Sequence, residues 1–220
     1  MRDELVYMAD SRHATVLRVR AANLDWVREE SRGLERVEWW VGWSAPPEIP
    51  EQLLTQGLVP DNVPVLRGMT CTVEPPEAPH VEVRQIITAA DHAEAVEVDW
   101  EVWQVDEEER AKRRATQRVR FEEDEASGVV HQFSALLDGR RVGFGRAIDM
   151  EDGVALMGGT VLPEARGCGV YRALVRARWE HAVSRGTPLL VVQAGDMSTP
   201  VLDGLGFVGH GEIRLFVDRL

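Results

Sequence analysis

The sequence of 220 residues lacks the features that mark several large classes of protein. It has only two cysteines, Cys71 and Cys168, too few for a disulfide framework, which favours a reducing cytoplasm. No run approaches the ~20 consecutive apolar residues that a membrane helix needs. The first residues, Met1–Leu5, show no basic flank followed by an apolar stretch, so we expect no signal peptide.

Positive charge is also scarce, because 37 acidic residues outnumber 25 basic ones and leave a formal net charge of −12. This balance disfavours binding to nucleic acid or to anionic lipid, so we expect neither a nucleic-acid nor a membrane partner. It is compatible with a cationic substrate such as an amine, although solubility alone also explains an acidic surface. The six histidines show no HExxH or comparable ligand spacing, which predicts no metal.

Three prolines within Glu74–Pro79 indicate a linker, and they divide the chain into residues 1–75, a linker at 76–79 and a domain at 80–220. In the larger part, hydrophobic periodicity and turn signals predict the following elements. They are a strand at 80–87, a helix at 93–98 with its cap within 88–91, a helix at 106–120, strands at 130–137, 141–148 and 154–161, a helix at 169–184, a strand at 189–193, a short helix at 199–205 and a strand at 213–217. Asp138-Gly139 indicates a hairpin turn. A meander followed by alternating strands and helices predicts an α/β (α+β) fold with a mixed sheet.

The first part of the chain echoes the end of the second. Trp26–Gly33 aligns with Trp179–Gly186, and Leu53–Val59 aligns with Leu202–Val208. The shared order of helix, strand and short helix favours a degenerate internal repeat, although identity this thin also arises by chance. The stretch Ala9–Thr15 contains no glycine, so we expect that this half has no phosphate loop.

Residues 161–171 join a predicted strand to a predicted helix and form the segment that carries chemistry. Gly167 and Gly169 let the backbone adopt positive φ and approach a ligand. The first N–H groups of the helix lack partners within it, so this helix start forms an anion site, to which Arg166 adds a phosphate contact. The predicted cofactor-binding residues are Val161, Leu162, Pro163, Arg166, Gly167, Cys168, Gly169, Val170, Tyr171 and Arg172. A Rossmann fingerprint would need glycine at Arg172, and a Walker Gly-Lys-Ser/Thr is absent.

Arg166, Gly169 and Tyr171 fall on the pattern Arg/Gln-x-x-Gly-x-Gly/Ala, so this stretch resembles motif A of the GNAT superfamily of acyl-CoA N-acyltransferases. Val201–Phe207 is similar to the Leu-Gly-Phe segment that ends the cofactor half of these proteins, and the resemblance covers residues 80–220. It implies acetyl-CoA as co-substrate and direct attack on the thioester by the amine of a small-molecule or peptide acceptor. A homodimer is compatible with it. Tyr171 departs from the pattern, and it either narrows the loop or stacks against the cofactor.

The same resemblance implies how the chemistry is arranged. Adjacent glycines, Gly158-Gly159, suggest a bulge whose backbone N–H groups meet the oxyanion, although weak strand packing explains them equally well. Trp100 and Trp103 lie where GNAT proteins build the wall of the acceptor site. Unlike most members, this chain has Leu202 at the position of the tyrosine that protonates the thiolate and Gly195 at the position of an asparagine.

The catalytic residues therefore stay unassigned. The remaining polar candidates are Asp196 and Ser198 near the pantetheine end, and His131, Asp149 and Asp152 near the acceptor side. The missing tyrosine leaves open a non-catalytic CoA sensor or scaffold, and a nucleotide-binding α/β protein is a third possibility.

Overall fold

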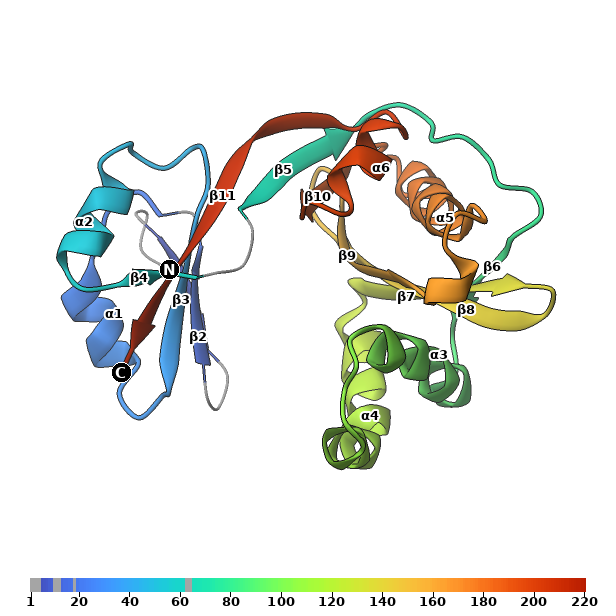
Figure 1. The fold of residues 1–220 in the computed structure, drawn as a ribbon, viewed down its shortest axis with the longest axis horizontal. Helices are drawn as coiled ribbons and strands as arrows, with labels where there is room; N and C mark the ends of the chain where they lie inside the picture. Colours follow the sequence, from blue (N-terminus) through green and yellow to red (C-terminus); the bar gives the residue numbers. More distant parts are fainter. Residues whose placement is uncertain (1–4, 10–12, 18, 62–64) are drawn as a thin grey trace. The chain divides into compact units, whose positions relative to one another are not determined.

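A computed structural model describes residues 5–9, 13–17, 19–61 and 65–220 (Figure 1). The chain forms two compact units that are interleaved along the sequence. Unit 1 comprises residues 1–69, 193–201 and 209–220, and unit 2 comprises residues 70–192 and 202–208. The stretch 9–15, for which we expect no phosphate loop, includes residues 10–12, which lie outside the described part. That expectation therefore stays a prediction.

Unit 1 is a sheet with two helices. Its strands lie in the order β1 (Val6–Ala9), β2 (His13–Leu17), β3 (Arg36–Val41) and β11 (Val208–Arg219), with β4 (Val59–Pro60) also paired to β11. β2 and β3 are parallel, whereas β1 and β11 run antiparallel to their neighbours. The helix α1 (Leu24–Glu30) connects the two parallel strands, as a parallel pair requires, and α2 (Ile49–Thr55) follows β3.

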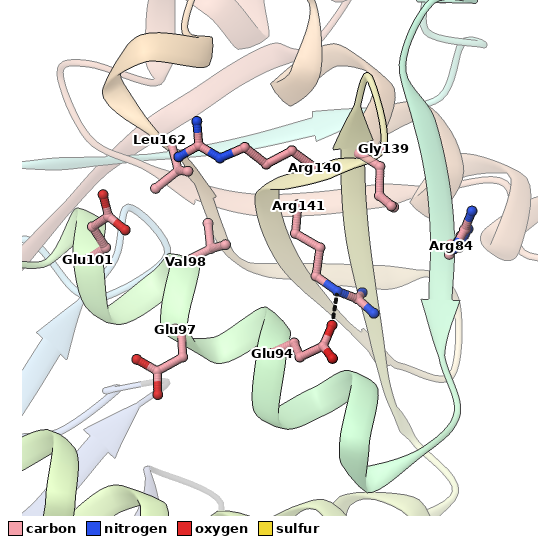
Figure 2. A pocket seen from close by; sticks show the side chains of 10 residues that line it. Arg84, Glu94, Glu97, Val98, Glu101, Gly139, Arg140, Arg141 and Leu162 are labelled. Atoms are coloured by element: carbon pink, nitrogen blue, oxygen red, sulfur yellow. Dashed lines mark hydrogen bonds and ion pairs between the residues drawn. The ribbon is translucent and has the colours of Figure 1, made fainter.

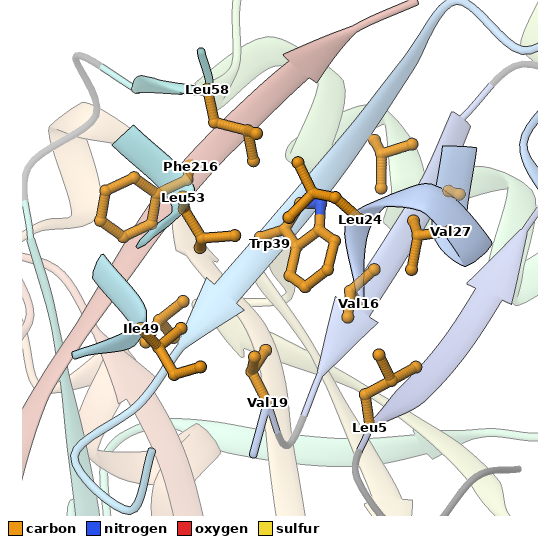
Figure 3. Packing of buried hydrophobic residues seen from close by; sticks show 13 residues of the cluster. Leu5, Val16, Val19, Leu24, Val27, Trp39, Ile49, Leu53, Leu58 and Phe216 are labelled. Atoms are coloured by element: carbon orange, nitrogen blue, oxygen red, sulfur yellow. The ribbon is translucent and has the colours of Figure 1, made fainter. Parts of the chain in front are cut away.

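The core of unit 1 lies between these helices and the sheet (Figure 3). Trp39, Leu53 and Phe216 come from β3, α2 and β11, and none of them is more than 3% exposed. The strand β11 is also bonded to α1. The Nε and Nη2 atoms of the Arg28 guanidinium donate to the Asp218 carboxylate, at 2.6 and 3.0 Å. Residues from the two ends of the sequence thus complete one core.

Unit 2 contains a five-stranded stretch of sheet in the order β6 (Glu82–Ile86), β7 (Val130–Leu137), β8 (Arg140–Asp149), β9 (Val154–Val161) and β10 (Leu190–Ala194). The first four strands are antiparallel and β10 is parallel to β9. The helices α3 (Ala89–Val102) and α4 (Glu107–Ser127) cover one face, and α5 (Val170–Ser184) covers the other (Figure 1). This arrangement confirms the predicted mixed α+β fold.

Local signals explain the element boundaries. The Thr88 hydroxyl accepts a hydrogen bond from the N–H of Asp91 and caps α3, and Asp106 caps α4 in the same way through Glu109. The helix α4 continues to Ser127, beyond the predicted end at residue 120, and the i,i+4 ion pair of Arg118 with Glu122 spans that extension. At the hairpin, φ is 51° for Asp138 and 78° for Gly139, which confirms the predicted tight turn.

The remaining elements are β5 (Leu66–Cys71), the 3₁₀ turn η1 (Pro163–Ala165) and α6 (Thr199–Asp203). Within the described ranges, no helix combines the length and the apolar character needed to cross a bilayer. The units share one topological feature, since β2–α1–β3 and β9–α5–β10 both connect parallel strands through a helix. The shared strand–helix–strand order favours the internal repeat, which stays a prediction.

Candidate active site

The strand β9 carries a bulge at the predicted position. Between the pairs Phe144↔Thr160 and Arg146↔Met157, two residues of β9 oppose one residue of β8. The extra residue is accommodated at Gly158, where φ is +62°, a conformation that glycine adopts without a steric penalty. The pairing of β9 with β10 covers only Val154 to Leu156. The backbone at Gly158 and Gly159 is therefore unpaired in both ladders, as a strand that presents N–H groups to a ligand requires.

A buried arginine fixes the orientation of this bulge. Arg178, on α5, is 0% exposed, and its Nη1 atom donates to the carbonyl oxygens of Gly158 and Arg146 at 3.1 and 3.2 Å. Burial lowers the pKa of this guanidinium to about 10. The peptide between Gly158 and Gly159 is trans, so its carbonyl and its N–H point in opposite directions. Because the Gly158 carbonyl is turned toward α5, the Gly159 N–H is directed toward the face covered by α3.

Replacing Arg178 by methionine should therefore reduce kcat more than it reduces the stability of the fold. Without its donor, the peptide after Gly158 is free to rotate, since glycine resists rotation least. Loss of an oxyanion donor costs about 10²- to 10³-fold in kcat, so a misdirected donor should cost at least about tenfold. The measurement is kcat and KM for acetyl-CoA in the wild type and Arg178→Met, with circular dichroism to confirm folding. A fall in thermal stability with unchanged kcat would show that Arg178 has only a packing role.

The predicted cofactor loop leads from β9 into α5. The N-cap residue Gly169 has φ +77°, and Gly167 has φ +79°. Of the ten predicted binding residues, Val161, Leu162 and Val170 are buried and can offer only backbone groups to a ligand. Exposed side chains around the loop belong to Pro163, Arg166, Cys168 and Arg172. Gly167 is exposed, and Gly169 and Tyr171 are half-buried. The Arg166 guanidinium donates to the Val161 carbonyl at 3.4 Å, which keeps it beside the end of β9.

The proline-rich segment predicted as a linker is anchored against this loop and helix. Arg176 of α5 donates to the carbonyl of Pro75 at 2.9 Å and pairs with Glu74. The ring of His80 bonds to the carbonyl of Cys168 at 2.8 Å. A Cβ atom at Gly169 would lie 3.2 Å from the Cβ of Ala78. The segment thus forms one wall of the loop.

Tyr171, the residue that departs from the motif, faces the bulged strand. A Cβ atom at Gly159 would lie 2.7 Å from Cε2 of the Tyr171 ring, so the ring covers this glycine on the α5 side. Burial raises the pKa of the Tyr171 phenol, which therefore stays protonated at neutral pH. The bulky residue is accommodated because its neighbour on β9 has no side chain.

On the opposite face of the bulge lies a carboxylate that we did not predict. Thr160, next to the bulge, donates from its hydroxyl to Asp99 of α3 at 3.2 Å. Burial raises the pKa of the Asp99 carboxyl above its ordinary value, and hydrogen bonds from Thr160 and Trp103 only partly offset this. A carboxylate with a raised pKa is a stronger base. Asp99 is accordingly the best-placed proton acceptor near the bulge in the described part of unit 2.

A cavity of about 520 Å³ lies between α3, the β7–β8 hairpin and the residue that follows β9 (Figure 2). Figure 2 shows Glu94, Glu97 and Glu101 along α3 and, of these three, Glu94 reaching Arg141. Glu94 pairs with Arg141, and Glu97 pairs with arginines of α4. Glu101 has no ion pair among the residues that the structure describes. It is therefore the carboxylate of this cavity that can accept a cationic group without displacing an arginine.

Other predicted candidates lie elsewhere. Leu202 is 0% exposed and belongs to the apolar core, so no proton donor stands at the usual tyrosine position. The hydroxyl of Ser198 donates to the carbonyl of Gly195 at 3.1 Å, a local bond within the turn before α6, and Asp196 is exposed. Trp100 is 5% exposed and packs in the core, so it does not line an acceptor site, whereas Trp103 is 66% exposed.

His131 and Asp149 are bonded to each other, but they lie far from the cofactor loop. Asp149 pairs with Val154, at the start of β9, whereas the cofactor loop follows Val161. Seven strand residues separate these positions, or roughly 23 Å. Asp152 is exposed in the turn after β8. These three residues thus lie away from the cofactor loop, and their place near the acceptor side stays a prediction.

Known proteins share this fold. A GCN5-related N-acetyltransferase from Sphaerobacter thermophilus is 14% identical, with a TM-score of 0.65 over 98% of this chain and 76% of its own. A GCN5-related N-acetyltransferase from Kribbella flavida is 16% identical, with a TM-score of 0.67 over 94% and 80% of the two chains. A tandem GNAT protein from the clavulanic acid biosynthesis pathway is 17% identical, with a TM-score of 0.65 over 98% and 78%.

The sequence itself matches a family. Among curated proteins no match is found. Residues 92–207, more than half of the chain, match the acetyltransferase (GNAT) family, whose members use acetyl-CoA. The match includes most of α3, the bulged strand, the glycine loop and α5, which are the elements that build the site described above. The chain belongs to the GNAT family of acetyltransferases.

Proposed function

We propose that this protein transfers an acetyl group from acetyl-CoA to the primary amine of a small-molecule or peptide acceptor. One observation carries the proposal: a bulged, partly unpaired strand runs directly into a loop of left-handed glycines at the start of α5. The loop supplies N–H groups and the positive end of a helix dipole for the pyrophosphate of the cofactor. Arg166, which is exposed beside it, adds a charge-assisted contact.

The bulge supplies the chemistry. The amine nitrogen bonds to the thioester carbon, the carbonyl oxygen takes up negative charge, and the carbon–sulfur bond then breaks to release the CoA thiolate. The Gly159 N–H, which Arg178 turns toward α3, is the proposed donor to the oxyanion. Asp99 is the proposed base that receives the proton from the amine. The thiolate takes its proton from water, because Leu202 offers none.

Binding and turnover are tested separately. Isothermal titration of the wild type with CoA and with acetyl-CoA should give saturable heat, and the absence of heat at millimolar ligand would contradict the cofactor assignment. Thiol release from acetyl-CoA is then followed across a panel of primary amines. Acceleration by one amine supports transfer and identifies an acceptor for the mutational experiments.

The buried Leu202 favours one alternative, a non-catalytic CoA sensor or scaffold. Such a protein would bind CoA in the titration, but no amine of the panel would accelerate thiol release. Arg178 and Asp99 argue for catalysis, since a sensor needs neither an oriented oxyanion donor nor a base beside it.

Unit 1 is proposed to be a degenerate GNAT-like part that has lost its cofactor. The tandem GNAT structure, which aligns with 98% of this chain, shares the fold over both units and favours this idea. A titration with two CoA molecules per chain, one of them insensitive to changes in the loop of unit 2, would contradict it.

A further inference from the structure

Two histidines converge on one carboxylate at the end of the unit 2 sheet that lies away from the cofactor loop. The Nε2 atoms of His131 and His181 lie 3.0 and 2.7 Å from different oxygens of Asp149. The two imidazole rings are 4.2 Å apart between centroids. The side chains are 11 to 20% exposed, so the cluster is largely sheltered yet open to small ions.

We propose that His131, Asp149 and His181 form a binding site for a divalent transition-metal ion such as Zn²⁺. One ligand atom from each of the three residues lies within 4.8 Å of the others. Tetrahedral zinc holds nitrogen and oxygen ligands at about 2.0–2.2 Å, so its ligand atoms are roughly 3.3 Å apart. The observed separations from Asp149 are only a few tenths of an ångström shorter. Small rotations of the side chains create the site, with water at the fourth position.

The rigidity of the elements favours binding. The ligands come from the start of β7, the end of β8 and the last turns of α5, all within unit 2. The side-chain amide of Gln85 lies 3.4 Å from Nδ1 of His131, and once turned so that its oxygen accepts the Nδ1 proton it orients the ring as the partners of metal-bound histidines do.

The local charge also permits a cation. Arg185 donates from Nε to the same Asp149 oxygen as His131, at 2.9 Å, which opposes metal binding. Its Nη atoms, however, are held by the carbonyls of Met150 and Gly153, so its position does not depend on Asp149. The turn after Asp149 carries two further carboxylates, from Glu151 and Asp152. Taken together, residues 149–153 and Arg185 are net negative.

The role of the ion would be structural. His181 follows the start of α5 by eleven residues, or about 16 Å of helix, so the ion is remote from the cofactor loop. It would fasten the C-terminal end of α5 to β7 and β8. The linear spacing gave no sign of this site, because its ligands are 18 and 32 residues apart on three elements.

The test uses full-length protein without a histidine tag, stripped with EDTA and dialysed. Titration with ZnCl₂ should show one saturable site and raise Tm, and CoCl₂ should give the visible absorption bands of four-coordinate Co²⁺. A lost outer-shell partner costs about 10- to 100-fold in metal affinity. Replacing a direct ligand, as in His131→Gln, His181→Gln or Asp149→Asn, should cost at least as much.

Two controls separate this site from other zinc ligands. His210→Gln removes a histidine of unit 1, and Cys168→Ser removes the exposed thiol, and both should keep wild-type zinc affinity. Absence of a saturable zinc site in the wild type would overturn the proposal, as would full zinc affinity in a folded Asp149→Asn variant. CoA titration of the ligand variants should match the wild type, so this test is independent of the proposed acetyl transfer.

Discussion

Replacing Asp99 by asparagine should reduce kcat by about 10²- to 10⁴-fold, the usual contribution of a general base. Asparagine keeps the size of the side chain and still accepts the hydrogen bond from Thr160, but it takes no proton. KM for acetyl-CoA should change little, because the cofactor loop lies on another part of unit 2. The measurement is thiol release with the amine selected by the panel, over a range of pH.

The matched control is Glu101→Gln, two residues further along α3. Glu101 is exposed and lies on the cavity side of the helix, so its loss should affect the KM of a cationic acceptor rather than kcat. Equal loss of kcat in both variants would show that the negative charge of α3, and not proton transfer to Asp99, supports the reaction.

The stability of the Asp99 variant provides a second readout with a defined sign. Because folding raises the pKa of Asp99, its contribution to stability is fully present below the unfolded pKa and is lost as pH rises through the folded pKa. At neutral pH, Asp99→Asn should therefore be at least as stable as the wild type. A clear fall in Tm at pH 7 would instead indicate that the carboxylate is a structural group.

The second large effect is expected at the N-cap of α5. Gly169→Glu should weaken CoA binding by at least about 100-fold, or roughly 2.7 kcal/mol. Three causes combine: a side chain at φ +77° is strained, its Cβ crowds Ala78, and its charge opposes the pyrophosphate. Isothermal titration with CoA measures the effect.

Gly186→Glu is the control for this variant. Gly186 also has φ +77°, it follows the other end of α5, and nothing lies within 4 Å of an added Cβ atom. It introduces the same strain and charge away from the loop, so CoA affinity should be retained. Similar losses in both variants would mean that backbone strain, rather than the cofactor site, explains the result at Gly169.

The sequence was sufficient for much of unit 2, because its signals are local. Alternating apolar residues, an Asp-Gly turn and capping residues each act within a few positions, and they predicted β7, β9 and α5 nearly to the residue. The pair Gly158-Gly159 also pointed to the bulge, although the sequence alone did not distinguish it from weak strand packing.

The chemical groups beside the bulge were missed, because each is a charged residue on a core-facing surface. Arg178 follows Val170 and Leu174 at helical spacing, and Asp99 follows His92 and Ala95 in the same way. A charge on such a face is a recognisable signal. Its partners cannot be read from sequence, since Gly158 and Thr160 are brought to them only by the packing of helices on the sheet.

The pairing of β3 with β11 imposes an order on folding. Arg28 of α1, the helix that precedes β3, pairs with Asp218 of β11, which lies 190 residues further along the sequence. Loop closure over such a distance carries a large entropic cost, so contacts of high contact order form late. During synthesis, β3 is made long before its partner β11. Until β11 pairs with it, the edge of β3 has unpaired backbone groups, and such edges promote aggregation. Unit 1 is therefore the part of the chain whose assembly waits for the synthesis of β11.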